Sequence, residues 1–275
     1  MRVRTPAVAG MFYPNEKNEL VETVKDCIMH QYGVGDFKIG KKIYGAVCPH
    51  AGYMYSGPVA THSFAAIAEQ DFELAIIIGP NHWGLGCQVA TMKDASWRTP
   101  IGDVQVDSDA ASMINRICKT IEIDFFSHIK EHSIEVQVPM MQEFCKNKFA
   151  ILPICMLDQE IECASEVGAA VAKIAKTRKS IIIGSSDLTH YEQNEVAHNQ
   201  DKALIEPILE MDVPLFYDVL KKRRVSACGY GAIAATIVAC KELGAGKGQL
   251  LKYATSGDVA GSKDSVVGYA SIVFS

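Results

Sequence analysis

Short apolar runs and longer amphipathic segments alternate along most of the chain. Seven of the short runs are rich in β-branched residues and predict strands. Two of them contain the continuous apolar stretches Ala75–Ile78 and Ile181–Ile183, which are typical of strands buried on both faces of a helix-covered sheet. The last run alternates in part and predicts an antiparallel member of a mixed sheet. The predicted strands are Ile43–Cys48, Leu74–Ile78, Gln88–Met92, Phe149–Ile154, Ser180–Ile183, Leu250–Ala254 and Val266–Phe274.

The amphipathic segments predict helices of ordinary length. Gly57 and Pro58 suit a helix start, because proline at the first helical position loses no N–H that the helix needs. Asp107 and Ser108 are placed to cap the third helix, and Pro139 must lie in the first turn of its helix or kink it. The predicted helices are Lys17–His30, Pro58–Gln70, Ser108–Thr120, Val136–Cys145, Ile161–Thr177, Glu195–Glu210, Pro214–Lys222 and Gly231–Leu243.

The alternation indicates an α/β fold with three layers, in which a mixed, mostly parallel sheet is flanked by helices. The chain has 275 residues, 48% of them hydrophobic, so residues 1–275 can bury a sizeable core as a single domain. The segment Lys93–Val106 interrupts the alternation. It therefore predicts an excursion over the surface.

Polar clusters that contain a histidine follow three of the predicted strands. His50 follows the first of these strands, His82 follows the second, and a segment with Asp187 and His190 follows the third. Ligands of α/β sheets bind in the crevice beyond the carboxyl ends of the strands, so we expect these four residues to lie within reach of one another. Imidazole nitrogen is a common ligand for iron, copper and zinc. The pattern therefore predicts a site, with a metal ion as its candidate occupant.

Each of these side chains also has a purely structural interpretation. A loop histidine can be hydrogen-bonded to backbone alone. Asp187, three residues before His190, can orient the imidazole or stabilise its protonated form, as a general base requires. It can equally cap a short helix. Tyr53 is a candidate for the pocket lining, and Trp83 is a candidate for shielding the site from water.

Cys228 is the further candidate, because it lies just before a predicted helix in the segment Ser226–Gly231. Backbone dipoles at a helix N-terminus favour a thiolate, which makes a cysteine there a better ligand or nucleophile. A buried structural cysteine is the alternative. His132 and Glu135 precede another predicted helix, and we interpret them either as supporting or substrate-binding residues of the same pocket or as parts of the helix entrance.

Composition limits the class of protein. The net charge is −5, and the only basic run is Lys221–Arg224 at the end of an amphipathic segment, so we expect no nucleic-acid partner. The N-terminal residues lack the apolar core of a signal peptide, and we expect no membrane span. Nine cysteines, an odd number without a CxxC pair, favour reduced thiols and a cytoplasmic location.

Seven segments, taken together and in order, resemble the Memo family, whose microbial members are encoded beside radical enzymes. The ordered set runs nearly from end to end of the chain, which makes the resemblance specific. The matching segments are Ala9–Pro14, Pro49–Tyr53, Gly79–His82, Trp97–Pro100, Glu131–Glu135, Ser185–His190 and Ser226–Gly229.

The resemblance implies a fold like the class III extradiol ring-cleaving dioxygenases, which hold non-haem Fe(II) with two histidines and a carboxylate. By this likeness His50 and His82 are metal ligands, and Cys228 stands in place of the carboxylate. His190 takes the position of the catalytic histidine, with Asp187 beside it. A thiolate is a softer ligand than a carboxylate, so Fe(II) or copper is the expected cofactor and zinc is also compatible.

The resemblance leaves three functions to compare. The first is a metal-dependent redox or dioxygenase-like enzyme acting on a small molecule or peptide in the metal pocket. The second is a non-catalytic module that binds a peptide or another ligand in the pocket of a dioxygenase-like ancestor. The third is a thiol enzyme with Cys228 as nucleophile and His190 as its base, which would leave His50 and His82 without a role. Family likeness also suggests a homo-oligomer. Phosphotyrosine binding, known for animal members, is disfavoured because Tyr191–Asn194 contains no arginine.

Overall fold

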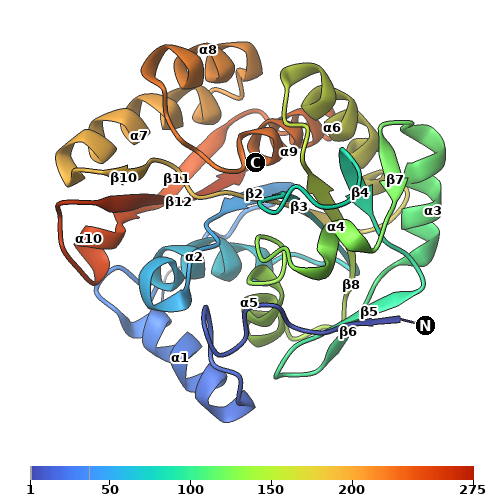
Figure 1. Ribbon diagram of the computed structural model, residues 1–275, viewed down its shortest axis with the longest axis horizontal. Coiled ribbons are helices and arrows are strands. Elements are labelled where there is room, and N and C mark those ends of the chain that lie inside the picture. The colour runs from blue at the N-terminus through green and yellow to red at the C-terminus, as the bar shows by residue number, and fades with distance from the viewer. Residues whose placement is uncertain (1, 37) are drawn as a thin grey trace.

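The computed structural model describes residues 2–36 and 38–275 (Figure 1). Met1, where the segment considered as a signal peptide begins, lies outside them. The strands are β1 (Arg2–Arg4), β2 (Gly45–Cys48), β3 (Leu74–Pro80), β4 (Val89–Thr91), β5 (Ala95–Arg98), β6 (Asp103–Gln105), β7 (Ile121–Ile123), β8 (Ala150–Met156), β9 (Ser180–Ser185), β10 (His190–Glu192), β11 (Gly248–Thr255) and β12 (Val266–Phe274). The helices are α1 (Lys17–Met29), α2 (Tyr53–Ala68), α3 (Ser108–Ile117), α4 (Phe126–Ile129), α5 (Gln137–Phe144), α6 (Ile161–Ala175), α7 (Asn194–Leu209), α8 (Val213–Arg223), α9 (Tyr230–Glu242) and α10 (Ser256–Val259).

The main sheet has the order β10-β12-β2-β9-β3-β8-β4-β7, and β11 pairs with β12. The central strands β2, β9, β3 and β8 are parallel. Pairing becomes antiparallel on either side, where β12 joins β2 and β4 joins β8. The prediction of a mixed α/β sheet flanked by helices is confirmed, and so is the antiparallel placement of Val266–Phe274.

Helices cover both faces of the sheet, as the central strands require. Ile76 and Ile78 on β3 point into a core formed with α3, α6, α7, α8 and α9. Ala75 and Ile77 on the same strand point into a second core, which includes α1, α2 and α5. All four side chains are fully buried. Alternate residues of one apolar strand thus fill two different cores, which explains why the run carries no polar position.

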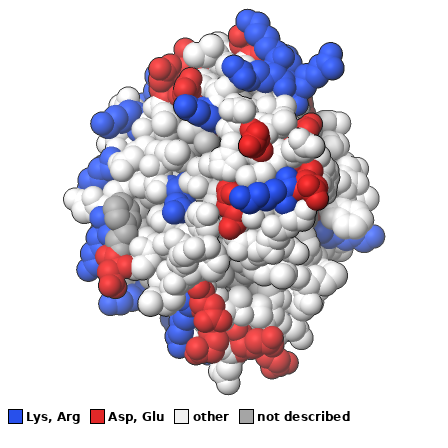
Figure 2. Space-filling model, turned by 90° about the vertical axis from the view of Figure 1, so that its left-hand side faces the viewer, with Lys and Arg blue, Asp and Glu red and all other residues white. Residues whose placement is uncertain are grey.

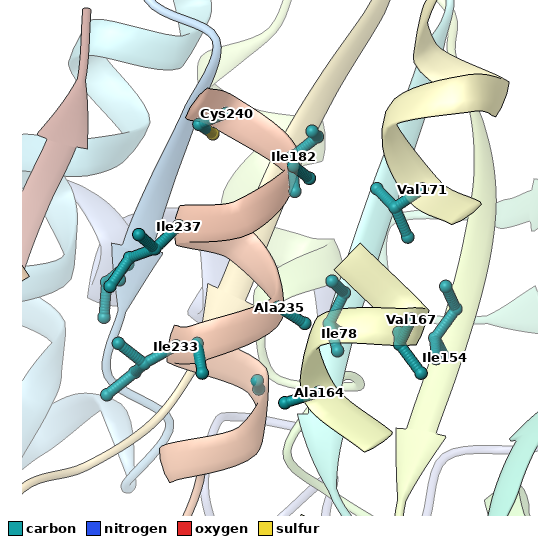
Figure 3. Close-up of a cluster of buried hydrophobic side chains, with 14 of the residues drawn as sticks. Ile78, Ile154, Ala164, Val167, Val171, Ile182, Ile233, Ala235, Ile237 and Cys240 are labelled. Atoms are coloured by element: carbon teal, nitrogen blue, oxygen red, sulfur yellow. The ribbon is translucent and has the colours of Figure 1, made fainter. Parts of the chain in front are cut away.

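Helices α6 and α9 pack closely over the first core (Figure 3). Gly168 permits this approach, because a Cβ atom there would lie 2.6 Å from the carbonyl oxygen of Ala235. Val167 on α6 lies beside Ile78 and Ile154 of the strands, and Ile182 is buried in the same core.

Two of the predictions made from the sequence, for the segment Lys93–Val106 and for the start of the second helix, were wrong. The segment Lys93–Val106 is not a surface excursion, because it contains β5 and β6, which form a small sheet with β1, and Trp97 is 1% exposed. Helix α2 does not begin at Pro58 but at Tyr53, five residues earlier. Gly57 and Pro58 lie inside the helix, and a Cβ atom at Gly57 would lie 2.5 Å from the sulfur of Cys27 on α1. Close packing between α1 and α2, rather than a helix start, accounts for this glycine.

The other helix signals agree with the structure. Asp107 caps α3 by accepting a hydrogen bond from the N–H of Ala110, and Pro139 lies in the first turn of α5. On the face drawn in Figure 2, both basic and acidic side chains occur in small groups around a broad uncharged area. Among the residues that the structure describes, none of the helices is both long and apolar enough to cross a bilayer.

Candidate metal centre

The carboxyl ends of three neighbouring parallel strands carry the predicted residues to one place. His50 lies two residues beyond β2, His82 two residues beyond β3, and Asp187 two residues beyond β9, which runs between them. The imidazole rings of His50 and His82 are 5.2 Å apart, centroid to centroid. The backbone N–H of His50 donates to Asp187 Oδ1 at 2.8 Å. The structure therefore brings together the residues that the strand pattern selected.

The ring of His50 is oriented by a serine on the adjacent strand. Ser185 Oγ donates to the carbonyl oxygen of Ser133 at 2.6 Å, and it accepts from the side chain of Gln137 at 2.7 Å. Its only proton is thus used, so His50 Nδ1, 2.9 Å away, is the donor to Ser185 Oγ. The Nε2 atom keeps its lone pair and faces the sulfur of Cys228 at 3.1 Å. Burial lowers the pKa of His50 well below its ordinary value, which keeps the ring neutral.

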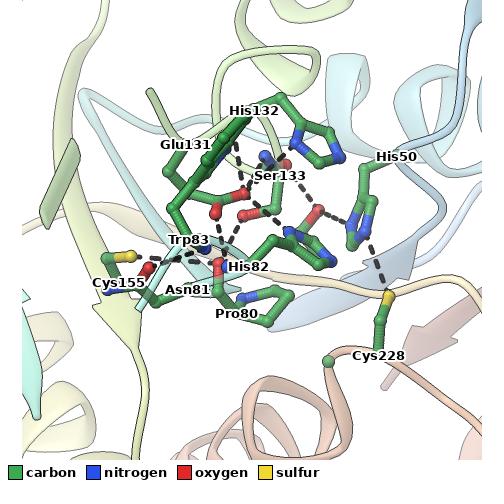
Figure 4. Close-up of polar contacts among 12 residues, drawn as sticks. His50, Pro80, Asn81, His82, Trp83, Glu131, His132, Ser133, Cys155 and Cys228 are labelled. Atoms are coloured by element: carbon green, nitrogen blue, oxygen red, sulfur yellow. Dashed lines mark hydrogen bonds and ion pairs between the residues drawn. The ribbon is translucent and has the colours of Figure 1, made fainter. Parts of the chain in front are cut away.

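A carboxylate orients the ring of His82, again through its Nδ1 atom (Figure 4). Glu131 Oε1 lies 2.9 Å from His82 Nδ1, and Oε2 accepts from the backbone N–H of His82 at 2.6 Å. Burial raises the pKa of Glu131, but the hydrogen bonds that it accepts from His82 and from backbone N–H groups outweigh burial and lower it to about 2. The ionised carboxylate must accept, so Nδ1 carries the proton and Nε2 is left free for a ligand.

His190, the first residue of β10, also has its Nδ1 atom held by hydrogen-bond acceptors. Its Nδ1 atom lies 2.7 Å from the carbonyl oxygen of Leu188 and 2.9 Å from that of Ser226. Two carbonyls can only accept, so Nδ1 is again the protonated nitrogen and Nε2 is free to act on a bound molecule. These backbone groups, rather than Asp187, orient the imidazole. Tyr191, the next residue, has a left-handed backbone with φ of 60° and exposes its ring at the mouth of the pocket.

Asp187 has a structural role that the sequence did not suggest. The residues around it form no helix, so it is not an N-cap. It is 4% exposed and accepts from the backbone of His50, while its own N–H lies 3.3 Å from the sulfur of Cys228. Burial raises its pKa to about 6. Asp187 therefore joins the strand end of His50 to the segment that carries Cys228.

Cys228 lies just before α9, as predicted, with Gly229 at the N-cap. Its sulfur contacts His50 Nε2 and the backbone of Asp187. Burial raises the pKa of the thiol, which opposes the thiolate that the helix N-terminus was expected to favour. In this setting the thiolate form needs a cation beside it.

The donor atoms form two sets that share His50. In the first set, nitrogen atoms of His50, His82 and His132 lie within 4.8 Å of one another. In the second set, donor atoms of His50, Asp187 and Cys228 do so. The predicted trio of His50, His82 and Cys228 is thus divided between the two sets.

Both sets open into a pocket of about 920 Å³. Its wall is largely aromatic and apolar, with His190 and Ser226 on one side. Among the described residues, those lining the pocket include neither lysine nor arginine. The apolar and aromatic part of the wall is formed by Met11, Phe12, Met54, Tyr55, Tyr191, Val267 and Tyr269.

Three of the predicted pocket residues lie elsewhere. Tyr53 is 3% exposed, donates to the carbonyl oxygen of Val136, and lines a smaller cavity next to the main one. Trp83 is 56% exposed, with the amine of Lys130 over its ring, so it faces solvent. Glu135 is buried and bonded to Arg4, to Tyr13 and to the backbone N–H groups of residues 7 and 8. His132, by contrast, lines the pocket.

Sequence reasoning missed Glu131, Ser185 and Ser226, which set the orientation of the three imidazoles. An acidic residue before a helix is usually explained by the helix dipole, and serines after a strand by turn formation. For Ser185, its position could have indicated the role, because it ends a strand whose two neighbours in the sheet are each followed by a histidine.

The comparisons with known proteins point to one family. A family model described as Memo-like protein matches residues 4–273. A MEMO1 family protein of Nitrosopumilus maritimus is 58% identical over 273 residues, which cover 99% of both chains. A MEMO1 family protein of Methanopyrus kandleri is 45% identical over 278 residues and 98% of both chains.

A solved structure supports the fold. An uncharacterized protein of Escherichia coli K12 aligns with a TM-score of 0.53 at 11% identity. The alignment covers 85% of this chain and all of the other. At this identity the likeness concerns the fold alone.

Proposed function

The chain belongs to the Memo-like family, and from that premise we propose that it is a metal-dependent oxidoreductase. His50, His82 and Cys228 would hold the ion, and a small molecule or peptide would occupy the adjoining pocket. The orientation of the imidazoles carries this proposal. His50 and His82 each direct Nδ1–H to a fixed acceptor and keep the Nε2 lone pair for a ligand, which is the usual arrangement of metal-binding histidines; that of His50 faces the sulfur of Cys228.

The available donor types fit iron or copper, and they are also compatible with zinc. Imidazole nitrogen binds all three ions, and a thiolate adds a soft ligand that suits copper and zinc. Burial raises the pKa of the Cys228 thiol, so its sulfur would bind as a thiolate only with a cation beside it. When bound, the ion would supply electron transfer and polarisation of a substrate oxygen.

The protein's own residues would perform the remaining tasks. His190 lines the same pocket and keeps the Nε2 lone pair, so it can take a proton from a bound substrate or return it. Ser226 and Leu188 keep that ring in one tautomer throughout. The aromatic wall would bind the apolar part of the substrate and exclude water from the reacting side.

Metal content tests the ligand assignment. Protein purified without oxygen should contain about one iron or copper ion per chain by mass spectrometry. His50→Ala and Cys228→Ser should each lose most of that metal, whereas His198→Ala should retain it, because His198 pairs with Asp258 away from the pocket lining. Unchanged metal content in both site variants would refute the assignment.

A ligand-binding module is the second candidate, and the size of the pocket favours it. A volume of about 920 Å³ lies within the range of small-molecule sites. Such a module would bind its ligand with equal affinity when metal-free. Calorimetry with the metal-free and metal-loaded protein separates the two functions, because affinity that disappears with the metal excludes a metal-independent module.

A further inference from the structure

His132 was interpreted from the sequence as a supporting residue or part of a helix entrance. In the structure its ring lies next to those of His50 and His82, the two histidines proposed as metal ligands. Its ring stacks on that of His82, with centroids 4.6 Å apart and 19° between the planes. It is also 5.5 Å from the ring of His50. Figure 4 shows the three rings close to one another, and nitrogen atoms of all three lie within 4.8 Å of one another. All three histidines line the main pocket.

A single buried carboxylate holds His82 and His132 together. Glu131 is 1% exposed, and its two oxygens receive both the ring and backbone N–H groups of His82. Oε1 also accepts from the backbone N–H groups of His132 and Ser133, at 2.9 and 2.8 Å. The Nδ1 atom of His132 lies 3.5 Å from the same oxygen. The side of the His132 ring that bears Nδ1 therefore faces the carboxylate, and the opposite side faces the pocket.

Glu131 is itself fixed in the protein core. The guanidinium of Arg4 donates to its carbonyl oxygen at 2.6 Å and to that of His128 at 3.0 Å. The same guanidinium pairs with the buried carboxylate of Glu135 and lies 4.3 Å from the ring of Trp97. A carboxylate with this support can fix two imidazoles at once, which is how ligand geometry is maintained in metal sites.

We propose that His132 is a third imidazole ligand of the metal centre, and that Glu131 positions His82 and His132 as one unit. This inference rests on the proposed metal-binding function and extends it. The centre then offers three nitrogen donors from His50, His82 and His132, with the sulfur of Cys228 on the other side of His50. A nitrogen-rich set of this kind suits Fe(II) and Cu(II), whereas His50 with Cys228 alone would favour softer ions.

The alternative is that His132 only forms part of the pocket wall. It packs on Phe12, with ring centroids 4.8 Å apart, and its side chain is 18% exposed. The variant His132→Phe separates the two roles, because phenylalanine keeps an aromatic ring against Phe12 and His82 but has no nitrogen. The backbone N–H that binds Glu131 is unchanged in this variant.

Cu(II) binding to the metal-free protein tests the proposal. Chelator competition should show at least tenfold weaker binding in His132→Phe than in the wild type. Pulsed electron paramagnetic resonance should show one coordinated imidazole fewer. Glu131→Gln should weaken binding by about 10–100-fold, as expected when a supporting partner of a ligand is altered. His198→Phe is the matched control and should match the wild type, since His198 lies outside the pocket lining.

The outcomes separate this inference from the proposed function. Wild-type affinity and an unchanged imidazole count in His132→Phe would overturn the inference, even if His50→Ala and Cys228→Ser lose the metal. A wild-type protein that binds no Cu(II) or Fe(II) at all would overturn the proposed function together with it. Urea midpoints of His132→Phe and Glu131→Gln show that each variant is folded before binding is measured.

Discussion

The two sides of the pocket are held in place by different means. The imidazole side, formed by His82 and His132, depends on the buried carboxylate of Glu131. The thiol side, formed by Asp187, His190 and Cys228, depends mainly on contacts with backbone groups. His50 lies between them and contacts both.

Because of this difference, we expect substitutions on the two sides to affect different properties, the stability of the fold on one side and binding on the other. On the imidazole side, the Arg4 guanidinium binds the backbone carbonyl of Glu131 and forms a fully buried ion pair with Glu135. Removal of either charge of that pair leaves its partner unpaired in the core. On the thiol side, the backbone groups remain when a side chain is changed. We therefore expect substitutions that reach the buried charges to reduce stability and substitutions on the thiol side to alter binding with little loss of fold.

The largest loss of stability is expected from substitution of Glu135, which forms the buried ion pair with Arg4. Its carboxylate accepts from Arg4, Tyr13 and the N–H groups of Ala7 and Val8, and it is 1% exposed. Glu135→Gln leaves the Arg4 guanidinium buried without its counter-charge. Breaking a buried pair in this way costs about 3–5 kcal/mol of unfolding free energy. Urea unfolding of the metal-free protein should show a correspondingly lower midpoint.

An exposed ion pair provides the matched control. Arg98 and Asp103 form two hydrogen bonds across β5 and β6, but both side chains are exposed to solvent. Asp103→Asn should leave the urea midpoint almost unchanged, because surface pairs contribute little. Equal midpoints for Glu135→Gln and the wild type would show that the buried pair does not support the imidazole side.

A smaller loss of stability is expected when the pH is lowered, because of the buried ring of His128 next to Arg4. This ring is fully buried, and neither nitrogen has a hydrogen-bond partner among the described residues. Burial, with the charge of Arg4, lowers its pKa from 6.5 to about 3. The unfolded chain binds a proton below pH 6.5 and the folded chain does not, so stability present above pH 6.5 is lost as the pH falls. At about 1.4 kcal/mol per unit, the loss from pH 7 to pH 5 is about 2 kcal/mol.

The variant His128→Phe isolates this contribution. It removes no hydrogen bond, and its unfolding free energy should fall by about 2 kcal/mol less than that of the wild type between pH 7 and pH 5. Parallel pH dependence in the two proteins would contradict the buried neutral state of His128.

The core of the fold and the first members of the site follow from the sequence pattern. Continuous β-branched runs predict central parallel strands, and their carboxyl ends must meet, which places His50, His82 and Asp187 together. Periodicity also predicted the long helices that bury one apolar face, such as α1, α3 and α6, whereas α2 and α9 are buried on almost all sides. These features depend on local sequence and on general rules of sheet geometry.

The remaining features depend on contacts between distant residues. Strand β1 has three residues, two of them arginines, and pairs with β5, which lies about ninety positions further along the chain. Arg4 is buried only because Glu135, Trp97 and the carbonyls of Glu131 and His128 surround it. No local pattern distinguishes this arginine from an exposed one, so neither β1 nor the role of Glu131 could be predicted.

The smallest effect on stability is expected on the thiol side, from Cys228→Ser. The sulfur is partly buried and contacts His50 Nε2 and the N–H of Asp187, both of which a hydroxyl can also bind. The metal-free variant should lose less than about 1 kcal/mol of unfolding free energy, because no buried polar group is left without a partner. Cobalt(II) added to the variant should lack the thiolate charge-transfer band that the wild type shows.

Cys240→Ser is the matched control for this comparison. Cys240 is fully buried in the core beside β2, where a Cβ atom at Gly45 would lie 2.7 Å from its sulfur. A hydroxyl there would be enclosed by apolar groups, so we expect a loss of about 1–3 kcal/mol with the cobalt spectrum unchanged. If Cys228→Ser destabilised the protein as much as Cys240→Ser and kept the charge-transfer band, Cys228 would be a structural cysteine. The thiol side would then share the structural role of the imidazole side.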